Sequence, residues 1–175
     1  MMNISETVSF EEAIAHTQAI MKQMEQGALS EDELEQTLTQ LVATENGARG
    51  FFVTYLTDER PIADQPSSAV LHALTTSPEI VSELLVKNLA MSSAMAIAHR
   101  RNDNEQMAQG SDRVRSRTTN LIEQLNLPQI VEKLQQLNES ATTGQGTYQG
   151  FLERWGYDAE QRQIIGDVSQ SAMPS

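Results

Sequence analysis

The most informative stretch of this sequence is residues 77–101, SPEIVSELLVKNLAMSSAMAIAHRR. Serine followed by proline is typical of a helix N-terminus, because proline fits the first helical position without losing a hydrogen bond. Residues 88–98 contain no charged side chain, and the apolar residues of the stretch do not keep to one face of a helix. A helix that is apolar on several sides is a buried helix. We therefore expect residues 77–101 to form the central helix of an all-α protein.

Two shorter helices are predicted before the central helix, each by a capping signal. Serine precedes glutamate by three residues at Ser9 and again at Ser30, which is the spacing of a capping box. The apolar residues that follow recur at steps of three and four, as on one face of a helix. We expect an antiparallel helical hairpin over residues 9–46, whose second helix ends at Asn46 and Gly47.

Residues 51–56, FFVTYL, have the composition of a β-strand. The sequence contains no second strand candidate, and a strand alone cannot satisfy its backbone hydrogen bonds. We therefore expect a short helix here, with a strand paired to another chain as the alternative.

The predicted fold class is all-α: a single-domain helical bundle of about six or seven helices, with the N-terminal helical hairpin and the buried central helix. No linker in the sequence divides residues 1–175 into two domains. Four ranges describe the expected organisation: an acidic helical hairpin at 9–46, central helices at 77–140, a C-terminal aromatic segment at 147–166 and a disordered tail at 167–175. The glycine-containing stretch ATTGQGT, residues 141–147, is expected to be a flexible linker.

The composition limits the classes of partner. The chain has 24 acidic and 12 basic residues, a net charge of −12, which disfavours nonspecific binding to nucleic acid. It has no cysteine, so disulfides, thiolate zinc sites and cysteine nucleophiles are excluded. The first residues, MMNISE, lack the basic and apolar regions of a signal peptide, and no uninterrupted apolar run approaches about 18 residues. We expect a cytoplasmic protein with no nucleic-acid and no membrane partner.

The sequence contains none of the common motifs of catalysis or cofactor binding. It has no phosphate-binding loop, no zinc-protease motif and no nucleophile elbow. Gly144, Gly146 and Gly150 are one residue off the dinucleotide-binding spacing, and they follow a helix instead of a strand. Alanine stands three residues before each histidine, where a di-iron bundle needs glutamate. We expect no metal and no cofactor, and an enzymatic function is disfavoured.

The basic residues of the middle region are the first candidate site. Arg113 and Arg117 share a helix face in mid-helix, where the helix dipole does not explain them. They either form salt bridges with the acidic hairpin of the same chain, or bind an anion or an acidic partner. His99 and Arg100 end the central helix, where positive side chains favour the helix dipole; the alternative for His99 is a metal or haem ligand.

The aromatic residues are the second candidate site, since seven of the eight lie in 51–55 and 148–157. Aromatic side chains are common both in cores and in interfaces. The later segment either folds back on residues 51–55 to close the core, or forms an exposed recognition surface. Its aromatic residues are Tyr148, Phe151, Trp155 and Tyr157.

The function predicted from these features is that of a non-catalytic protein-interaction or regulatory protein. The alternative is a helical bundle that binds a small ligand, an anion or a tetrapyrrole. A protein partner is expected, and also a homodimer, because burying the central helix takes more helices than the short neighbouring ones supply. The candidate partner-binding or ligand-binding residues are Arg113, Arg117, His99, Arg100, Tyr148, Phe151, Trp155 and Tyr157.

Overall fold

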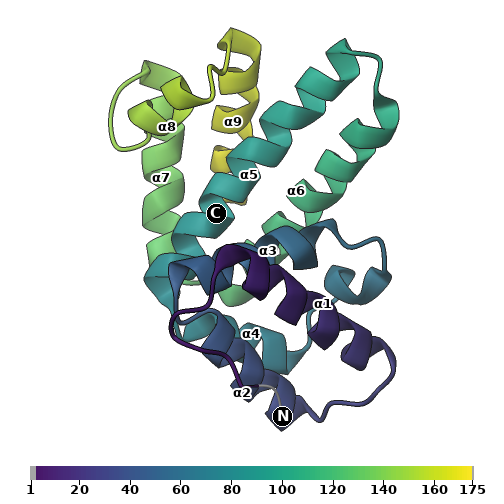
Figure 1. Cartoon of the computed structure of the whole chain (residues 1–175). Coiled ribbons are helices and arrows are strands. Elements are labelled where there is room, and N and C mark those ends of the chain that lie inside the picture. Colours follow the sequence, from purple (N-terminus) through teal and green to yellow (C-terminus); the bar gives the residue numbers. More distant parts are fainter. Residues whose placement is uncertain (1–2, 175) are drawn as a thin grey trace. The chain divides into compact units, whose positions relative to one another are not determined.

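The computed structural model describes residues 3–174, which form nine α-helices and one short 3-10 helix and contain no strand (Figure 1). The predicted all-α fold class is therefore confirmed, with more helices than the six or seven expected. The internal contacts of the chain divide it into two compact units, Met1–Leu84 and Leu85–Ser175. The boundary between the two units falls inside helix α5 (Pro78–Arg101), so it does not coincide with a linker.

The N-terminal unit contains the first helices of the chain and the start of α5. These elements are α1 (Phe10–Glu25), α2 (Glu31–Leu41), α3 (Glu45–Thr57), the 3-10 helix η1 (Pro61–Asp64) and α4 (Ser68–Thr75). Both predicted capping serines are confirmed, because the hydroxyls of Ser9 and Ser30 accept hydrogen bonds from the backbone N–H groups of Glu12 and Glu33 at 3.0 and 3.1 Å. Helix α1 packs mainly on α3, and α2 packs mainly on α4. Each helix of the expected hairpin is thus paired with a helix further along the chain.

The expected end of the second helix at Asn46 is wrong, because a new helix begins at Glu45. The hydroxyl of Thr44 accepts a hydrogen bond from the backbone N–H of Gly47 at 3.1 Å and so caps α3. Residues Asn46 and Gly47 therefore lie in the first turn of α3. The same helix contains residues 51–56, and the short helix expected there is confirmed.

Helix α5 begins and ends where the sequence predicts. Its buried core residues are Val81, Leu85, Val86, Leu89, Ala90 and Ala94, each 0% exposed. The hydroxyl of Ser93 is buried too, and it donates a hydrogen bond to the carbonyl oxygen of Leu89 at 2.7 Å, which satisfies it inside the helix. By length and composition α5 could also cross a membrane, but 56% of its most apolar 18-residue window is buried in this structure. Core helices pass the same test, so this is weak support for a membrane span.

The C-terminal unit contains the rest of α5 together with α6 (Glu105–Leu125), α7 (Pro128–Thr143), α8 (Gln149–Arg154) and α9 (Ala159–Ala172). Helices α7 and α9 lie side by side in Figure 1. They are antiparallel, since the side-chain amide of Asn138 donates a hydrogen bond to the carbonyl oxygen of Gly166 at 2.9 Å, and the C-terminal end of α7 lies beside Arg162, near the start of α9.

Two expectations about the C-terminal region are wrong. Helix α7 continues through Thr143, so the first residues of the expected linker at 141–147 are helical, and the helix ends only at Gly144, whose φ of 76° is left-handed. Helix α9 continues through Ala172, so most of the expected disordered tail is helical, and Ser175 lies outside the described residues. An aspartate capping box starts α9 and supports more turns than the apolar pattern alone indicated.

Candidate functional site

The α8 segment, defined here as residues 148–158, connects α7 to α9 and carries four of the eight candidate residues. Its start is fixed by Ser140, whose hydroxyl accepts a hydrogen bond from the backbone N–H of Tyr148 at 3.0 Å. Its end is fixed by Asp158, the N-cap residue of α9. The backbone of the segment is therefore held at both ends.

Three aromatic residues of the α8 segment are turned inward. Tyr148 is 3% exposed and Tyr157 is 9% exposed. The ring of Phe151 lies between them in edge-to-face contacts, with centroid distances of 6.4 Å to Tyr148 and 6.3 Å to Tyr157. Burial raises the pKa of Tyr157 to about 12, so its phenol is neutral at ordinary pH. The three rings thus pack together, with Tyr148 and Tyr157 buried and Phe151 half-buried between them.

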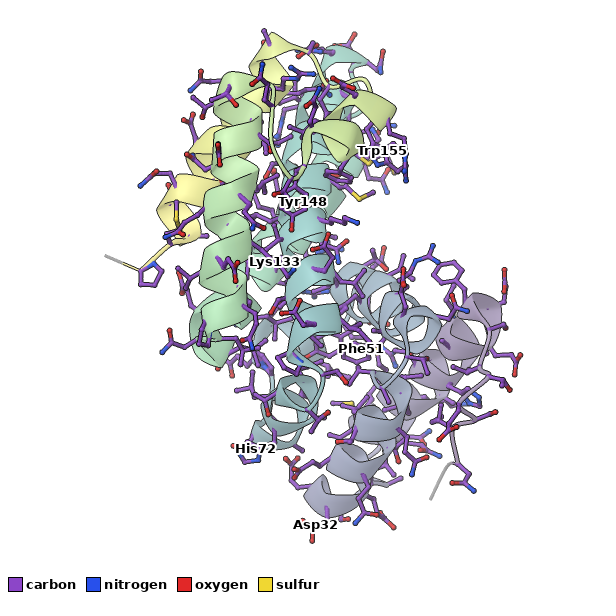
Figure 2. The ribbon with its side chains drawn as sticks, turned by 90° about the vertical axis from the view of Figure 1, so that its left-hand side faces the viewer. Asp32, Phe51, His72, Lys133, Tyr148 and Trp155 are labelled. Atoms are coloured by element: carbon purple, nitrogen blue, oxygen red, sulfur yellow. The ribbon has the colours of Figure 1, made fainter. Side chains whose placement is uncertain are left out.

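Trp155 is turned outward, with 54% of its surface exposed. It is the C-cap residue of α8, and its backbone N–H donates a hydrogen bond to the carbonyl oxygen of Phe151 at 3.3 Å. Figure 2 shows Trp155 at the outer edge of the α8 segment, while Tyr148 lies among the helices. The sequence does not show which of the four aromatic residues faces water, whereas the structure shows that Trp155 does.

The α8 segment lies along α5 and is attached to it on both sides of Trp155. On one side the ammonium of Lys87 lies 5.6 Å from the ring centroid of Phe151. On the other side the guanidinium of Arg101 pairs with the carboxylate of Asp158 at 2.5 Å. Between Lys87 and Arg101, α5 carries Met95, which is 42% exposed. We call the exposed side chains of Trp155 and Met95 the α8 surface.

Neither Lys87 nor Met95 was among the residues predicted from the sequence. Both belong to the long apolar helix, and nothing in their sequence neighbourhood shows which side of α5 the α8 segment covers. The helical repeat carries a weak signal, since Lys87, Ala94 and Arg101 recur at seven-residue steps and so share one face of α5. The side-chain amide of Gln161 donates to the carbonyl oxygen of Ala94 at 3.2 Å, which places the start of α9 on this same face.

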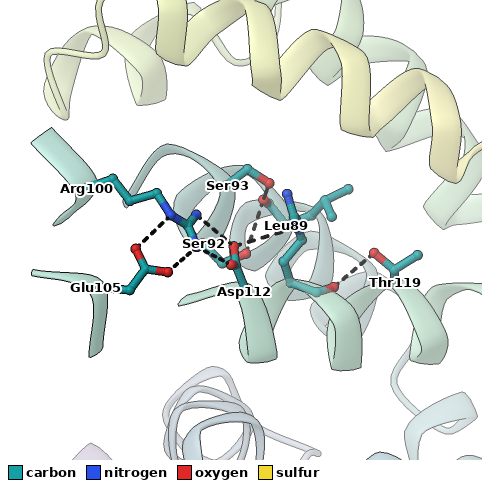
Figure 3. A network of polar contacts seen from close by, with 8 residues as sticks. Leu89, Ser92, Ser93, Arg100, Glu105, Asp112 and Thr119 are labelled. Carbon is teal, nitrogen blue, oxygen red and sulfur yellow. Dashed lines mark hydrogen bonds and ion pairs between the residues drawn. The ribbon is translucent and has the colours of Figure 1, made fainter. Parts of the chain in front are cut away.

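Arg100 takes part in an ion-pair network that links α5 to α6 (Figure 3). Its guanidinium pairs with Asp112 at 2.7 Å and with Glu105 at 3.1 Å. Hydrogen bonds to Asp112 and then to Glu105 raise the pKa of Arg100 further above its already high value. Arg115 approaches the same Asp112 at 3.6 Å. The charge of Arg100 is thus matched by carboxylates of its own chain.

The remaining basic candidates do not form one surface. Arg113 is exposed, whereas Arg117, one helical turn later, is only 3% exposed. His99 is partly buried at the end of α5. Within residues 3–174, no group of three or more histidine or carboxylate side chains is placed to hold a metal ion. Of the eight predicted residues, the structure brings together Tyr148, Phe151 and Tyr157 and turns Trp155 outward. It separates Arg113 from Arg117 in exposure.

The ion pair of Arg101 with Asp158 predicts a pH dependence. The hydrogen bond from Arg101, followed by that from the backbone N–H of Gln161, lowers the pKa of Asp158 below its ordinary value. A carboxylate with a lowered pKa in the folded state stabilises the fold above its ordinary pKa, and this contribution is lost as the pH falls through the lowered value. In an NMR titration of the Asp158 carboxyl carbon we expect a midpoint below the ordinary value for aspartate.

In the same titration, Arg101→Gln should move the Asp158 midpoint upward, because it removes the stronger of the two hydrogen bonds. Arg113→Gln, a change at an exposed arginine of α6, should leave the midpoint where it is. An unchanged midpoint in Arg101→Gln would show that the α8 segment is not attached to α5 at this point.

The chain was also compared with known proteins. Residues 9–172 match the model of a protein family described as uncharacterised conserved protein UCP020893. The searches of curated proteins and of solved structures gave no match.

Proposed function

We infer that this chain, which belongs to the family whose model its residues 9–172 match, is a non-catalytic protein that binds another protein through the α8 surface. The observation that carries the proposal is the exposure of Trp155, 54%, on a segment whose backbone is held at both ends. The exposure is specific to this position, since Tyr148 and Tyr157 in the same segment are buried.

The chemistry of the α8 surface suits protein binding. Tryptophan is among the residues most enriched at the energetic centres of protein interfaces, because one side chain removes a large apolar area from water. A backbone that is already ordered loses little conformational entropy on binding, so more of that contact energy is retained as affinity. Met95 adds a flexible apolar side chain that adapts to the shape of a partner.

The proposal includes self-association as the first interaction to test. A two-fold dimer uses the same surface on both copies, and the exposed apolar side chains of Trp155 and Met95 can each pack on a second copy. We therefore propose that the homodimer predicted from the sequence forms through the α8 surface.

The experiment compares the wild type with Trp155→Ser by sedimentation at micromolar concentration. We expect a dimer for the wild type and a monomer for Trp155→Ser. Val53→Ser is the matched control, since Val53 on α3 is also an exposed apolar residue, at 44%. This control should leave the dimer intact. Equal masses for the wild type and Trp155→Ser would contradict the role of Trp155.

Fluorescence gives a second measurement on the wild type, because Trp155 is the only tryptophan of the chain. With rising protein concentration, its emission should shift to shorter wavelength and become protected from a soluble quencher. An emission that stays solvent-exposed at all concentrations would contradict self-association through this surface.

A further inference from the structure

A groove lies between α7 and α9, with a volume of about 740 Å³. It is lined by twelve residues of the C-terminal unit, of which Asn138, Thr142, Gly144, Tyr157, Arg162 and Asp167 matter here. The groove does not involve Trp155 or Met95, and the inference drawn from it is independent of the α8 surface.

Small residues and one hydrogen bond lie along the groove. A Cβ atom at Gly166 would be in ordinary van der Waals contact with Thr142 and Ala141, at 3.8 and 3.9 Å, so α9 lies close to α7 at this position. The side-chain amide of Asn138 donates to the carbonyl oxygen of Gly166 and holds the two helices at this separation. At one end of the groove, Gly144 terminates α7 in the left-handed conformation, where only hydrogen projects from its Cα.

Arg162 lines the groove beside Gly144, with Nη1 3.6 Å from the position that a Cβ of Gly144 would take. The Nε of Arg162 is shielded from solvent and, among the residues described, has no acceptor. Within residues 3–174, four lysine or arginine side chains have no hydrogen bond, ion pair or ring contact: Lys22, Arg113, Arg154 and Arg162. The first three are exposed to water, and only Arg162 is partly buried.

The carboxylates near Arg162 in sequence have other partners. Glu160 lies 3.5 Å from the guanidinium of Arg101. Asp158, the N-cap residue of α9, stands four residues before Arg162. At this spacing a carboxylate and an arginine often form an ion pair in a helix. Asp158 is instead paired with Arg101, and its carboxylate caps α9 by accepting from the backbone N–H of Gln161 at 3.0 Å. Asp167 accepts a hydrogen bond from the side-chain amide of Gln163 at 3.0 Å. A partly buried guanidinium is therefore left facing a groove.

We propose that this groove is a binding site for a small carboxylate, anchored by the terminal nitrogens of Arg162. The planar fork of a guanidinium matches a carboxylate with two parallel hydrogen bonds. The C-terminal end of α7 and Asp167 already place negative charge at the groove, which favours a singly charged anion over phosphate. The carboxylate of Asp167 can accept a hydrogen bond from the ligand. The ligand class is therefore a carboxylate that also carries a hydroxyl or an ammonium group.

The test is a titration of the full chain with lactate, glycine, acetate and inorganic phosphate at constant ionic strength, followed by the NMR signal of the Arg162 Nε–H group. We expect saturable shifts with lactate or glycine, weaker ones with acetate and the weakest with phosphate. Lactate against glycine distinguishes a hydroxy acid from an amino acid. A response to phosphate as strong as that to the carboxylates would overturn the assignment of ligand class, and the absence of a saturable shift with any of the four would overturn the site.

Two variants separate the site from a general effect of charge. Arg162→Gln should weaken binding by at least about tenfold, as measured by calorimetry, since it removes a charge-assisted pair of hydrogen bonds. Arg154→Gln removes an exposed arginine of α8 and should bind like the wild type. Equal binding by Arg162→Gln and the wild type would overturn the proposal. If Arg162→Gln does not fold, the titration of the wild type decides by itself.

Discussion

Gly50→Ala should destabilise the protein by about 2–3 kcal/mol, the upper part of the usual range of about 1–3 kcal/mol for overpacking a well-packed core. Gly50 lies on α3 where it crosses α1, and an added Cβ would stand 2.4 Å from the Cβ of Ala13. It would also stand 3.0 Å from two backbone atoms, the carbonyl carbon of Ala13 and the nitrogen of Ile14. Because backbone cannot rotate away, α1 must move as a whole. This cost exceeds the roughly 1 kcal/mol that alanine gains over glycine in a helix.

Gly110→Ala is the matched control, with an effect of opposite sign. Gly110 is also helical, in α6, and a Cβ at this position would meet no atom within 4 Å. The change should stabilise the protein by about 0.5–1 kcal/mol, because only the helix preference remains. Thermal melts followed by circular dichroism measure both variants. Shifts of the same sign for the two variants would contradict the close crossing of α1 and α3.

Leu137→Ala should cost about 2–5 kcal/mol of stability, the range for truncating a buried leucine. Leu137 is on α7, is 0% exposed and has no polar atom to rearrange. The removed atoms leave a cavity in the C-terminal unit, where α7 packs on α9. The free energy of unfolding should be measured in denaturant titrations followed by the fluorescence of Trp155, which belongs to the same unit.

The control for this truncation is Gln135→Ala on the exposed side of the same helix. A surface change of this kind stays within about ±0.5 kcal/mol. A loss for Leu137→Ala as small as that for Gln135→Ala would mean that α7 and α9 are not packed as described here.

The starts of α1, α2 and α5 could be predicted from the sequence because each depends on one or two residues. A serine at Ser9 or Ser30, or a proline at Pro78, acts on N–H groups within three residues of itself, so the signal is local. Helix ends were less predictable. Asn46 and Gly47 are typical of a turn, but the hydroxyl of Thr44 caps a new helix that contains both.

The candidate site was predicted only as a set of residue types. The sequence indicates that Tyr148, Phe151, Trp155 and Tyr157 lie close together in the chain, but not which of them faces water. The exposure of each aromatic residue depends on which face of α5 the α8 segment covers. The choice of face depends on contacts between distant residues, such as that of Lys87 with Phe151. Arg162 was missed for the same reason, since its groove exists only when α7 and α9 are packed together.

The boundary between the two compact units has a consequence for any attempt to separate them. A truncation between Leu84 and Leu85 would divide α5 into a piece of seven residues and a piece of 17. The shorter piece is below the roughly 12–15 residues that an isolated helix needs in water. A gene fusion or an exchange of halves with a relative should therefore join the chains in a connecting loop, and a split at the boundary itself would produce two fragments with frayed ends.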